Sequence, residues 1–275
     1  MGRCFSILHW SGCWHFPVKT SDCESRLKVR LDKLIVDRGL AASRERAQAL
    51  ILAGNVLVDD QKLEKAGVQV NEESVIRLLG EDLKYVSRGG LKLERALEHW
   101  KINVTGQVCL DVGASTGGFT DCLLQHGAAR VIAVDTGYGQ LDFRLRRDVR
   151  VRLLEKTNAR YLTKEAIGDT ADLIVMDVSF ISATLVLPAV VAAAFPELPE
   201  DRRGRQIVVL VKPQFEAGRE AVGKGGIVRD ENAQMAAVDR VKIAVQGLGA
   251  MQTDVIESPI LGAEGNREFL LYGAF

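Results

Sequence analysis

Four charged residues directly follow short apolar runs of the chain, which could bring their side chains to one site. The runs are Val108–Leu110, Val131–Val134, Leu173–Met176 and Ile207–Val211, and the residues after them are Asp111, Asp135, Asp177 and Lys212. Apolar runs of this length are typical of strands buried in a parallel sheet. The carboxyl ends of such strands line the crevice where open α/β sheets bind ligands. Each charge alone could be a helix cap or a solvent-facing residue, but four in succession favour a shared functional site.

A glycine-rich turn lies between the first two of these runs and narrows the choice of ligand. Gly113, Gly117 and Gly118 leave the backbone nearly free of side chains, and a helix that begins near Phe119 is expected to follow. The resulting βαβ unit can bind a nucleotide-like ligand, because the ligand approaches bare backbone amides at the helix start. Asp135, at the tip of the second strand, can accept both hydrogen bonds of a ribose diol.

Three chemistries fit this turn. Binding of NAD(P) or FAD requires glycine at the second motif position, where the chain has Ser115. The segment Gly113–Gly117 also satisfies the G-x-S-x-G pattern of hydrolases, but that mechanism needs a downstream histidine and the last histidine is His126. The third is binding of S-adenosylmethionine, with Asp111 and the turn at the amino-acid portion and Asp135 at the ribose. We favour the third, and expect Asn158, at the end of a third strand, to contact the adenine ring.

Composition limits the class of protein to an ordinary globular chain. The 275 residues are 47% hydrophobic and 26% charged with a net charge of zero, so any affinity for nucleic acid must be local. Five cysteines, an odd number, argue against a disulfide framework and for the cytoplasm. No run is long and apolar enough for a membrane span. Residues 1–25 contain cysteines and histidines without a zinc-binding spacing, and we predict a poorly ordered tail there.

The region after this tail predicts two helices and a strand. Apolar residues recur on one face up to Gly39, a second helix begins after Ser43 and ends at Gly54, and Val56–Val58 alternates as a strand. Basic residues outnumber acidic ones through both helices: they are Arg26, Lys28, Arg30, Lys33, Arg38, Arg44 and Arg46. Such a face suits a phosphate backbone, but surface helices commonly carry lysine and arginine, and charge alone leaves both interpretations open.

The details of this region resemble an S4 RNA-binding domain. The similarity rests on Arg30–Leu34, Gly39, Ser43–Ala47, Leu50, Ile51, Gly54 and Val56–Val58. The resemblance implies an RNA partner gripped by the two-helix face. Our candidate RNA-binding residues are Arg30, Lys33, Arg44, Arg46 and, in the segment that links the halves, Arg88.

The order of motifs along the whole chain resembles the TlyA family, whose catalytic half is similar to the FtsJ ribose methyltransferases. These motifs are an S4 domain, SRGGLKL, DVGASTGGFTD, VDTGYGQL, MDVSFIS, LVKPQFE and GNREFL. The resemblance implies an α/β, Rossmann-like methyltransferase sheet over residues 86–275, preceded by an S4-like domain over residues 26–85. It also implies transfer of a methyl group from S-adenosylmethionine to the 2′-oxygen of ribosomal RNA, typically of cytidine. Ribosomal RNA or a ribosomal subunit would be the partner.

The same resemblance assigns a Lys-Asp-Lys-Glu tetrad to Lys92, Asp177, Lys212 and Glu268, with Lys212 as the activating residue. A ribose hydroxyl is a weak nucleophile, so a lysine must accept its proton or lower its pKa by charge. Without the resemblance, Lys92 lies off the apolar stripe of its helix as a solvated lysine, and Glu268 is an edge residue. The candidate cofactor-binding residues are Asp111, Gly113, Ser115, Gly117, Gly118, Phe119, Asp135, Asn158 and Asp177. No metal is required.

Other functions fit the sequence less well. An RNA-binding protein without catalysis predicts a damaged cofactor turn, whereas every cofactor and tetrad position is filled. A membrane-lytic protein, suggested only by the haemolysin label of some family members, requires an amphipathic or spanning segment that we do not find. A nicotinamide oxidoreductase is disfavoured by Ser115. One departure from the family is Tyr85, where some relatives have tryptophan.

Overall fold

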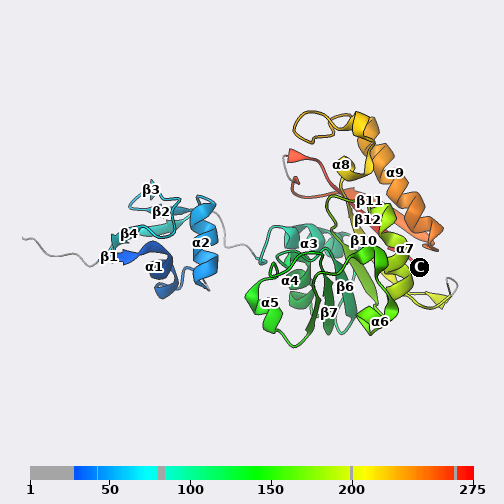
Figure 1. The fold of residues 1–275 in the computed structure, drawn as a ribbon, viewed down its shortest axis with the longest axis horizontal. Helices are drawn as coiled ribbons and strands as arrows, with labels where there is room; N and C mark the ends of the chain where they lie inside the picture. Colours follow the sequence, from blue (N-terminus) through cyan, green and yellow to red (C-terminus); the bar gives the residue numbers. More distant parts are fainter. Residues whose placement is uncertain (1–27, 42, 80–83, 199–200, 263–264) are drawn as a thin grey trace, which may run out of the picture. The chain divides into compact units, whose positions relative to one another are not determined.

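The computed structural model describes residues 28–41, 43–79, 84–198, 201–262 and 265–275, and the chain divides into two compact units between Glu81 and Asp82. Figure 1 shows the elements of each unit. The tail expected at residues 1–25 lies outside the described residues. The division falls four residues before the expected boundary between 85 and 86. Tyr85 is buried among apolar residues of the larger unit, and its side chain lies against Gly90.

The smaller unit joins two helices to two small sheets. Its helices are α1 (Leu31–Asp37) and α2 (Arg44–Leu52). Strands β1 (Lys28–Arg30) and β4 (Gln69–Asn71) form one antiparallel pair, and β2 (Val56–Val58) lies between β3 (Gln61–Lys62) and β5 (Ile76–Leu78) in the other sheet. The Ser43 hydroxyl accepts a hydrogen bond from the Arg46 N–H and caps α2. Buried apolar side chains of both helices pack on β2 and form one core, which matches the expected helix-helix-strand order.

The larger unit is built on a seven-stranded sheet in the order β11-β12-β10-β9-β6-β7-β8. Strands β6 (Val108–Val112), β7 (Arg130–Val134), β8 (Val151–Leu154), β9 (Leu173–Met176) and β10 (Gln206–Val211) are parallel. Strand β12 (Phe269–Ala274) is antiparallel to both β10 and β11 (Gln252–Glu257). The four apolar runs of the sequence therefore form neighbouring central strands, as expected. The strand order reverses between β6 and β9, which is where open α/β sheets bind ligands.

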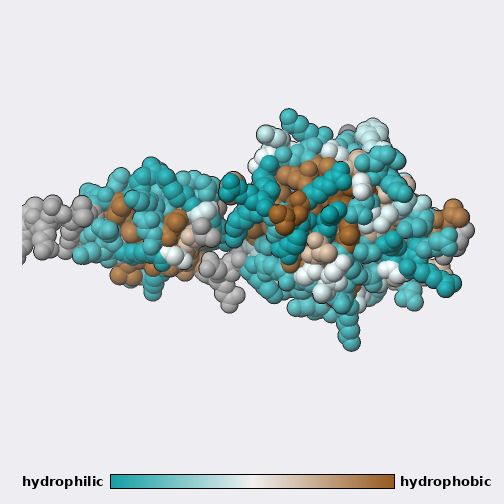
Figure 2. Space-filling view, turned by 90° about the horizontal axis from the view of Figure 1, so that it is seen from below, coloured by the Kyte–Doolittle hydropathy of each residue, from teal (hydrophilic) through white to brown (hydrophobic). Residues whose placement is uncertain are grey.

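Helices cover both faces of this sheet. On one face α3 (Gly89–His99), α4 (Gly118–Gln125) and α5 (Phe143–Arg147) pack against alternate residues of the strands. The other face is covered by α6 (Lys164–Ile167), α7 (Leu187–Ala194) and α9 (Glu231–Gly247), and the short α8 (Pro213–Glu216) follows β10. In Figure 2 the larger unit presents a patch of hydrophobic residues bordered by hydrophilic ones, whereas the visible face of the smaller unit is mostly hydrophilic.

Candidate active site

The turn after β6 lies against the end of β9, at the point where the strand order reverses. Gly113 has a φ of +86°, and a Cβ there would lie 2.4 Å from the carbonyl oxygen of Asp177. Glycine is therefore the residue that this close approach requires. Ser115 also has a left-handed backbone, with a φ of +49°. The N–H groups of Gly113 and Ala114 donate to the Val134 carbonyl and that of Ser115 donates to Asp135, so these amides of the turn already have partners within the protein. The turn leads directly into α4.

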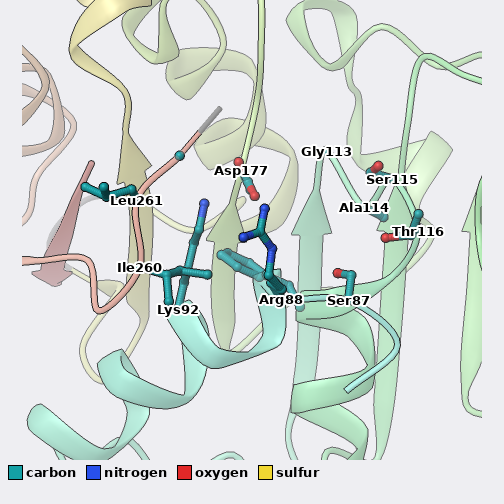
Figure 3. A pocket seen from close by; sticks show the side chains of 14 residues that line it. Ser87, Arg88, Lys92, Gly113, Ala114, Ser115, Thr116, Asp177, Ile260 and Leu261 are labelled. Carbon is teal, nitrogen blue, oxygen red and sulfur yellow. The ribbon is translucent and has the colours of Figure 1, made fainter. Parts of the chain in front are cut away.

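Two adjoining cavities lie at this turn, of about 260 Å³ and about 420 Å³, and Gly113, Ser115 and Asp177 line both. The smaller cavity also includes Arg88 and Lys92 from the start of α3 (Figure 3). The larger one is lined further by Val112, Val134, Asp135, Thr136, Gln140, Thr157, Asn158, Ala159, Val178, Ser179, Phe180, Ile181 and Val186. Together they form a trough along the carboxyl ends of the central strands.

Asp135 and Asn158 lie in the larger cavity, as a nucleoside-binding role requires. The carboxylate of Asp135 accepts hydrogen bonds from the N–H groups of Ser115 (2.8 Å) and Gly137 (2.6 Å), which fixes its orientation. Asn158 does not end a strand, because β8 stops at Leu154. Its side chain instead caps a short 3₁₀ turn by accepting a hydrogen bond from the Arg160 N–H, at 3.0 Å.

Two expected cofactor residues lie away from the cavity surface. Asp111 is fully buried in β6, where it accepts a hydrogen bond of 2.6 Å from the Thr120 hydroxyl. Burial raises the pKa of Asp111 to about 7, and the negative charges of Asp177 and Asp135 act in the same direction. Gly117 has a φ of +98°, and a Cβ there would meet Leu145 and Leu141, so this glycine serves packing. The structure gives both residues a supporting place behind the turn.

Gly118 and Phe119, at the start of α4, both line the smaller cavity. A Cβ on Gly118 would lie 2.3 Å from the Ser87 hydroxyl and 2.9 Å from the Gly90 nitrogen. The starts of α3 and α4 therefore approach each other closely. Phe119 is almost fully buried, so only a small part of its phenyl ring is exposed in the cavity.

Lys212 and Asp177 form one half of the expected tetrad. The Lys212 Nζ lies 2.6 Å from Asp177 Oδ1 and donates a hydrogen bond of 2.7 Å to the Ser179 hydroxyl. The side chains of Lys212 and Asp177 are 11% and 23% exposed, so the pair is largely removed from water but still reachable. Ser179 had no assigned role in the sequence, although it lies two residues after Asp177 in the same run.

Lys92 and Glu268 form the other half. Their side chains are only 10% and 3% exposed, and the Lys92 ammonium donates a hydrogen bond to the Glu268 carboxylate. The interpretations of Lys92 as solvated and of Glu268 as an edge residue are wrong. The first turn of α3 lies at the site, and Glu268 precedes β12 inside the sheet. Figure 3 shows Lys92 and Arg88 pointing toward Asp177.

Glu216 is a second residue that the sequence did not single out. It is buried, and its carboxylate accepts hydrogen bonds from the Ser182 hydroxyl (2.5 Å) and the Ala183 N–H (2.6 Å). Burial raises the pKa of Glu216. These bonds tie the segment after β10, which carries Lys212, to the segment after β9, which carries Asp177. The sequence feature that could have indicated a role for Glu216 is its position in the segment that begins with Lys212.

The candidate RNA-binding residues divide between the two units. Arg30 and Arg44 lie together in the smaller unit, because both guanidinium groups bind the carboxylate of Asp32. Lys33 is exposed beside them, and Arg46 is half-buried. Arg88 belongs to the larger unit, where it lines the smaller cavity and is exposed.

Neither a membrane span nor a metal cluster is present in the part of the chain that the structure describes. None of its helices combines the length and apolar character that crossing a membrane requires. No group of three or more His, Cys, Asp and Glu side chains within the described ranges is placed to hold a metal ion.

A Rossmann-like sheet with a glycine turn at its switch point, acidic residues in a nucleoside-sized trough and two lysine–carboxylate pairs defines an S-adenosylmethionine-dependent methyltransferase. Residues 85–275 match the FtsJ-like methyltransferase family, and residues 29–76 match the S4 domain. The chain belongs to the FtsJ-like methyltransferases and, within them, to the TlyA or haemolysin A family. This assignment confirms the family, the fold class and the methyl donor expected from the sequence.

Curated relatives support this placement along nearly the whole chain. The 16S/23S rRNA (cytidine-2′-O)-methyltransferase TlyA of Mycobacterium tuberculosis is 47% identical over 246 residues, 89% of each chain. Hemolysin A of Brachyspira hyodysenteriae is 42% identical over 89% of this chain and 99% of its own length. A solved structure from Streptococcus thermophilus that carries a hemolysin name is 42% identical, with a TM-score of 0.66, and covers 90% of this chain and 89% of that one.

Proposed function

We propose that the chain methylates the 2′-oxygen of cytidine in ribosomal RNA, with S-adenosylmethionine as donor, in the cytoplasm. The observation that carries this proposal is that Asp177, paired with Lys212, and Lys92, paired with Glu268, both line the smaller cavity of the trough. The name of the M. tuberculosis relative supports the substrate, and the S4 domain supports an RNA partner.

The residues of the trough fit the donor. The turn at Gly113 and Ser115 offers bare backbone at the boundary of both cavities, where a sulfonium and its methyl group would lie. Asp135 would accept hydrogen bonds from the ribose diol, and Asn158, which lines the same cavity, would contact the adenine. Asp177 would face the junction between donor and target sugar. When bound, the donor supplies a methyl group on a positively charged sulfur.

Lys212 is the activating residue in this proposal. Its amino group, held between Asp177 and Ser179, has two possible roles. As a neutral amine it accepts the proton of the ribose hydroxyl, and as an ammonium it lowers the pKa of that hydroxyl by its charge. The hydroxyl oxygen then forms its bond to the methyl carbon as the carbon–sulfur bond breaks, and the proton leaves through the lysine or water. Alignment of the two reacting atoms supplies much of the acceleration.

The second pair reaches the smaller cavity through Lys92, which lines it. Glu268 is almost fully buried and fixes the Lys92 ammonium at the first turn of α3. Lys92 then presents a positive charge to the target ribose and its phosphate. Arg88, one turn earlier and exposed in the same cavity, would contact the RNA backbone.

The test is direct. The purified chain should transfer labelled methyl groups from S-adenosylmethionine to unmodified ribosomal RNA or ribosomal subunits, and ribose-methylation mapping should locate a cytidine that is unmodified in cells without the gene. A chain that binds this RNA but transfers no methyl group would instead support a non-catalytic RNA-binding protein.

A further inference from the structure

Asp32 is a buried carboxylate that gathers the basic side chains of the smaller unit. It lies at the start of α1 and is fully buried. Arg30 donates to both of its oxygens, from Nε (3.0 Å) and Nη2 (2.9 Å), and Arg44 donates from Nη2 (3.0 Å). Gln48 Nε2 and the Lys33 N–H each add a further bond of 2.9 Å.

These bonds leave the two arginines partly available. The side chains of Arg30 and Arg44 are 46% and 52% exposed, although Asp32 itself is inaccessible. A guanidinium has five N–H donors in a planar fork, so one edge can be held by the protein while the other remains for a phosphate. The pKa of Asp32 lies well below its ordinary value, chiefly because of its hydrogen bonds to Arg30, so the carboxylate stays charged and holds both arginines at neutral pH.

We propose that Asp32 is a positioning residue for RNA binding, which holds Arg30 and Arg44 as a fixed pair that grips RNA phosphates. The inference rests on the proposed function, since it takes RNA as the ligand of this unit. Arg30 belongs to β1 and Arg44 to α2, and the buried carboxylate of Asp32 binds both of their guanidinium groups. Arginines ordered before binding lose less conformational freedom when the RNA arrives.

Charge counting predicts the opposite effect, and this makes the inference testable. The negative charge of Asp32 offsets one positive charge of a basic surface. If only net charge mattered, neutralising Asp32 should strengthen the binding of a polyanion. If Asp32 orders the arginines, neutralisation should weaken binding, because the released side chains must be ordered again by the RNA.

The experiment compares Asp32→Asn with the wild-type full-length chain. Binding to unmodified 16S and 23S ribosomal RNA transcripts is measured over a series of salt concentrations. We expect the variant to bind about tenfold more weakly, the size of one lost charge-assisted contact, with unchanged kcat at saturating RNA and unchanged affinity for S-adenosylmethionine. Asp60→Asn is the matched control, because Asp60 forms an exposed ion pair with Arg77 in the same unit.

A second variant separates positioning from folding. Arg44→Lys keeps the charge and leaves Asp32 paired with Arg30, but lysine cannot hold the carboxylate and a phosphate with one planar group. It should also weaken RNA binding, and combining it with Asp32→Asn should cost less than the sum of the two losses. Arg77→Lys, at the exposed pair, should bind RNA as the wild type does.

The outcomes distinguish this inference from the proposed function. Equal or tighter RNA binding by Asp32→Asn overturns the inference. If that variant loses its thermal unfolding transition, full RNA affinity in Arg44→Lys overturns it instead. In either case, methyl transfer by the wild type still supports the proposed function. Weaker binding in both variants together with no methyl transfer by the wild type supports the inference and overturns the function.

Discussion

At the scale of single residues, the proposed chemistry uses lysines that are held by carboxylates. Lys212 has both Asp177 and Ser179 within 2.7 Å of its Nζ, so its ammonium has few orientations left. In the proposed mechanism this restriction aligns the lysine with a ribose hydroxyl. Lys164 on α6, by contrast, is an exposed lysine outside both cavities.

Replacement of Lys212 should therefore separate catalysis from binding. We expect Lys212→Ala to lower kcat by about 10²- to 10⁴-fold, the range of a lost proton-transfer group, with the affinity for S-adenosylmethionine within about twofold of the wild type. Single-turnover methyl transfer and calorimetry measure the two quantities, and Lys164→Ala is the control. Strong residual activity would remove Lys212 from the activating role.

Asp111 gives the stability of the larger unit a distinct pH dependence. Because burial raises its pKa to about 7, against about 4 in an unfolded chain, the native state binds its proton more tightly. Its contribution to stability is thus lost as the pH rises from about 4 to about 7 and stays constant above that. Asp111→Asn removes this dependence, so its free energy of unfolding relative to wild type should increase between pH 5 and pH 8. Denaturant unfolding at both values checks this; a constant difference would contradict it.

At the scale of elements, the turn between β6 and α4 joins the two cavities. Its shape depends on Gly113, whose backbone lies against the end of β9. A substitution there has no flexible side chain to displace, because the atom in contact is a backbone oxygen.

Gly113→Ala should accordingly damage both fold and donor binding. We expect a loss of about 2 kcal/mol or more in the free energy of unfolding and at least a tenfold loss of affinity for S-adenosylmethionine. Gly139→Ala is a matched control: its φ is +74°, yet nothing lies within 4 Å of the added Cβ. That variant should lose only about 1 kcal/mol and keep its donor affinity. Equal effects in the two variants would show that contact with Asp177 is unimportant.

The sequence predicted the secondary-structure elements better than it predicted which distant residues contact each other. Apolar runs and glycines located the four central strands and the turn, because strand burial and left-handed backbone leave local signals. The burial of Lys92 and Glu268 left no local signal, since it depends on a contact across 176 residues. Only family resemblance indicated that they act together. Asp111 and Gly117 were expected to contact the ligand because they lie at the end of a strand and in the glycine turn. In the structure Asp111 is buried in β6, and Gly117 lies against Leu141 and Leu145.

At the scale of the whole molecule, each compact unit has a hydrophobic core of its own. The cofactor trough and both lysine–carboxylate pairs belong entirely to the larger unit. The paired Arg30 and Arg44 belong to the smaller one. Donor binding and RNA gripping should therefore be separable.

A chain of residues 82–275 tests this separation. We expect it to unfold in one cooperative transition and to bind S-adenosylmethionine as the full chain does, because no residue of the trough is removed. Its affinity for ribosomal RNA should fall by tenfold or more, with a shallower dependence on salt, since fewer phosphates are neutralised. Unchanged RNA affinity would assign recognition to the larger unit.

In the proposed mechanism, the position of Glu268 in the chain also affects when the active site can be assembled during synthesis. It immediately precedes β12, the strand inserted between β10 and β11, whereas its partner Lys92 lies on the first helix of the larger unit. A nascent chain that has completed the glycine turn still has Lys92 without its carboxylate. In the proposed mechanism the site is therefore complete only when β12 has been synthesised and has paired with β10 and β11, so a nascent chain that lacks β12 is expected not to transfer methyl groups.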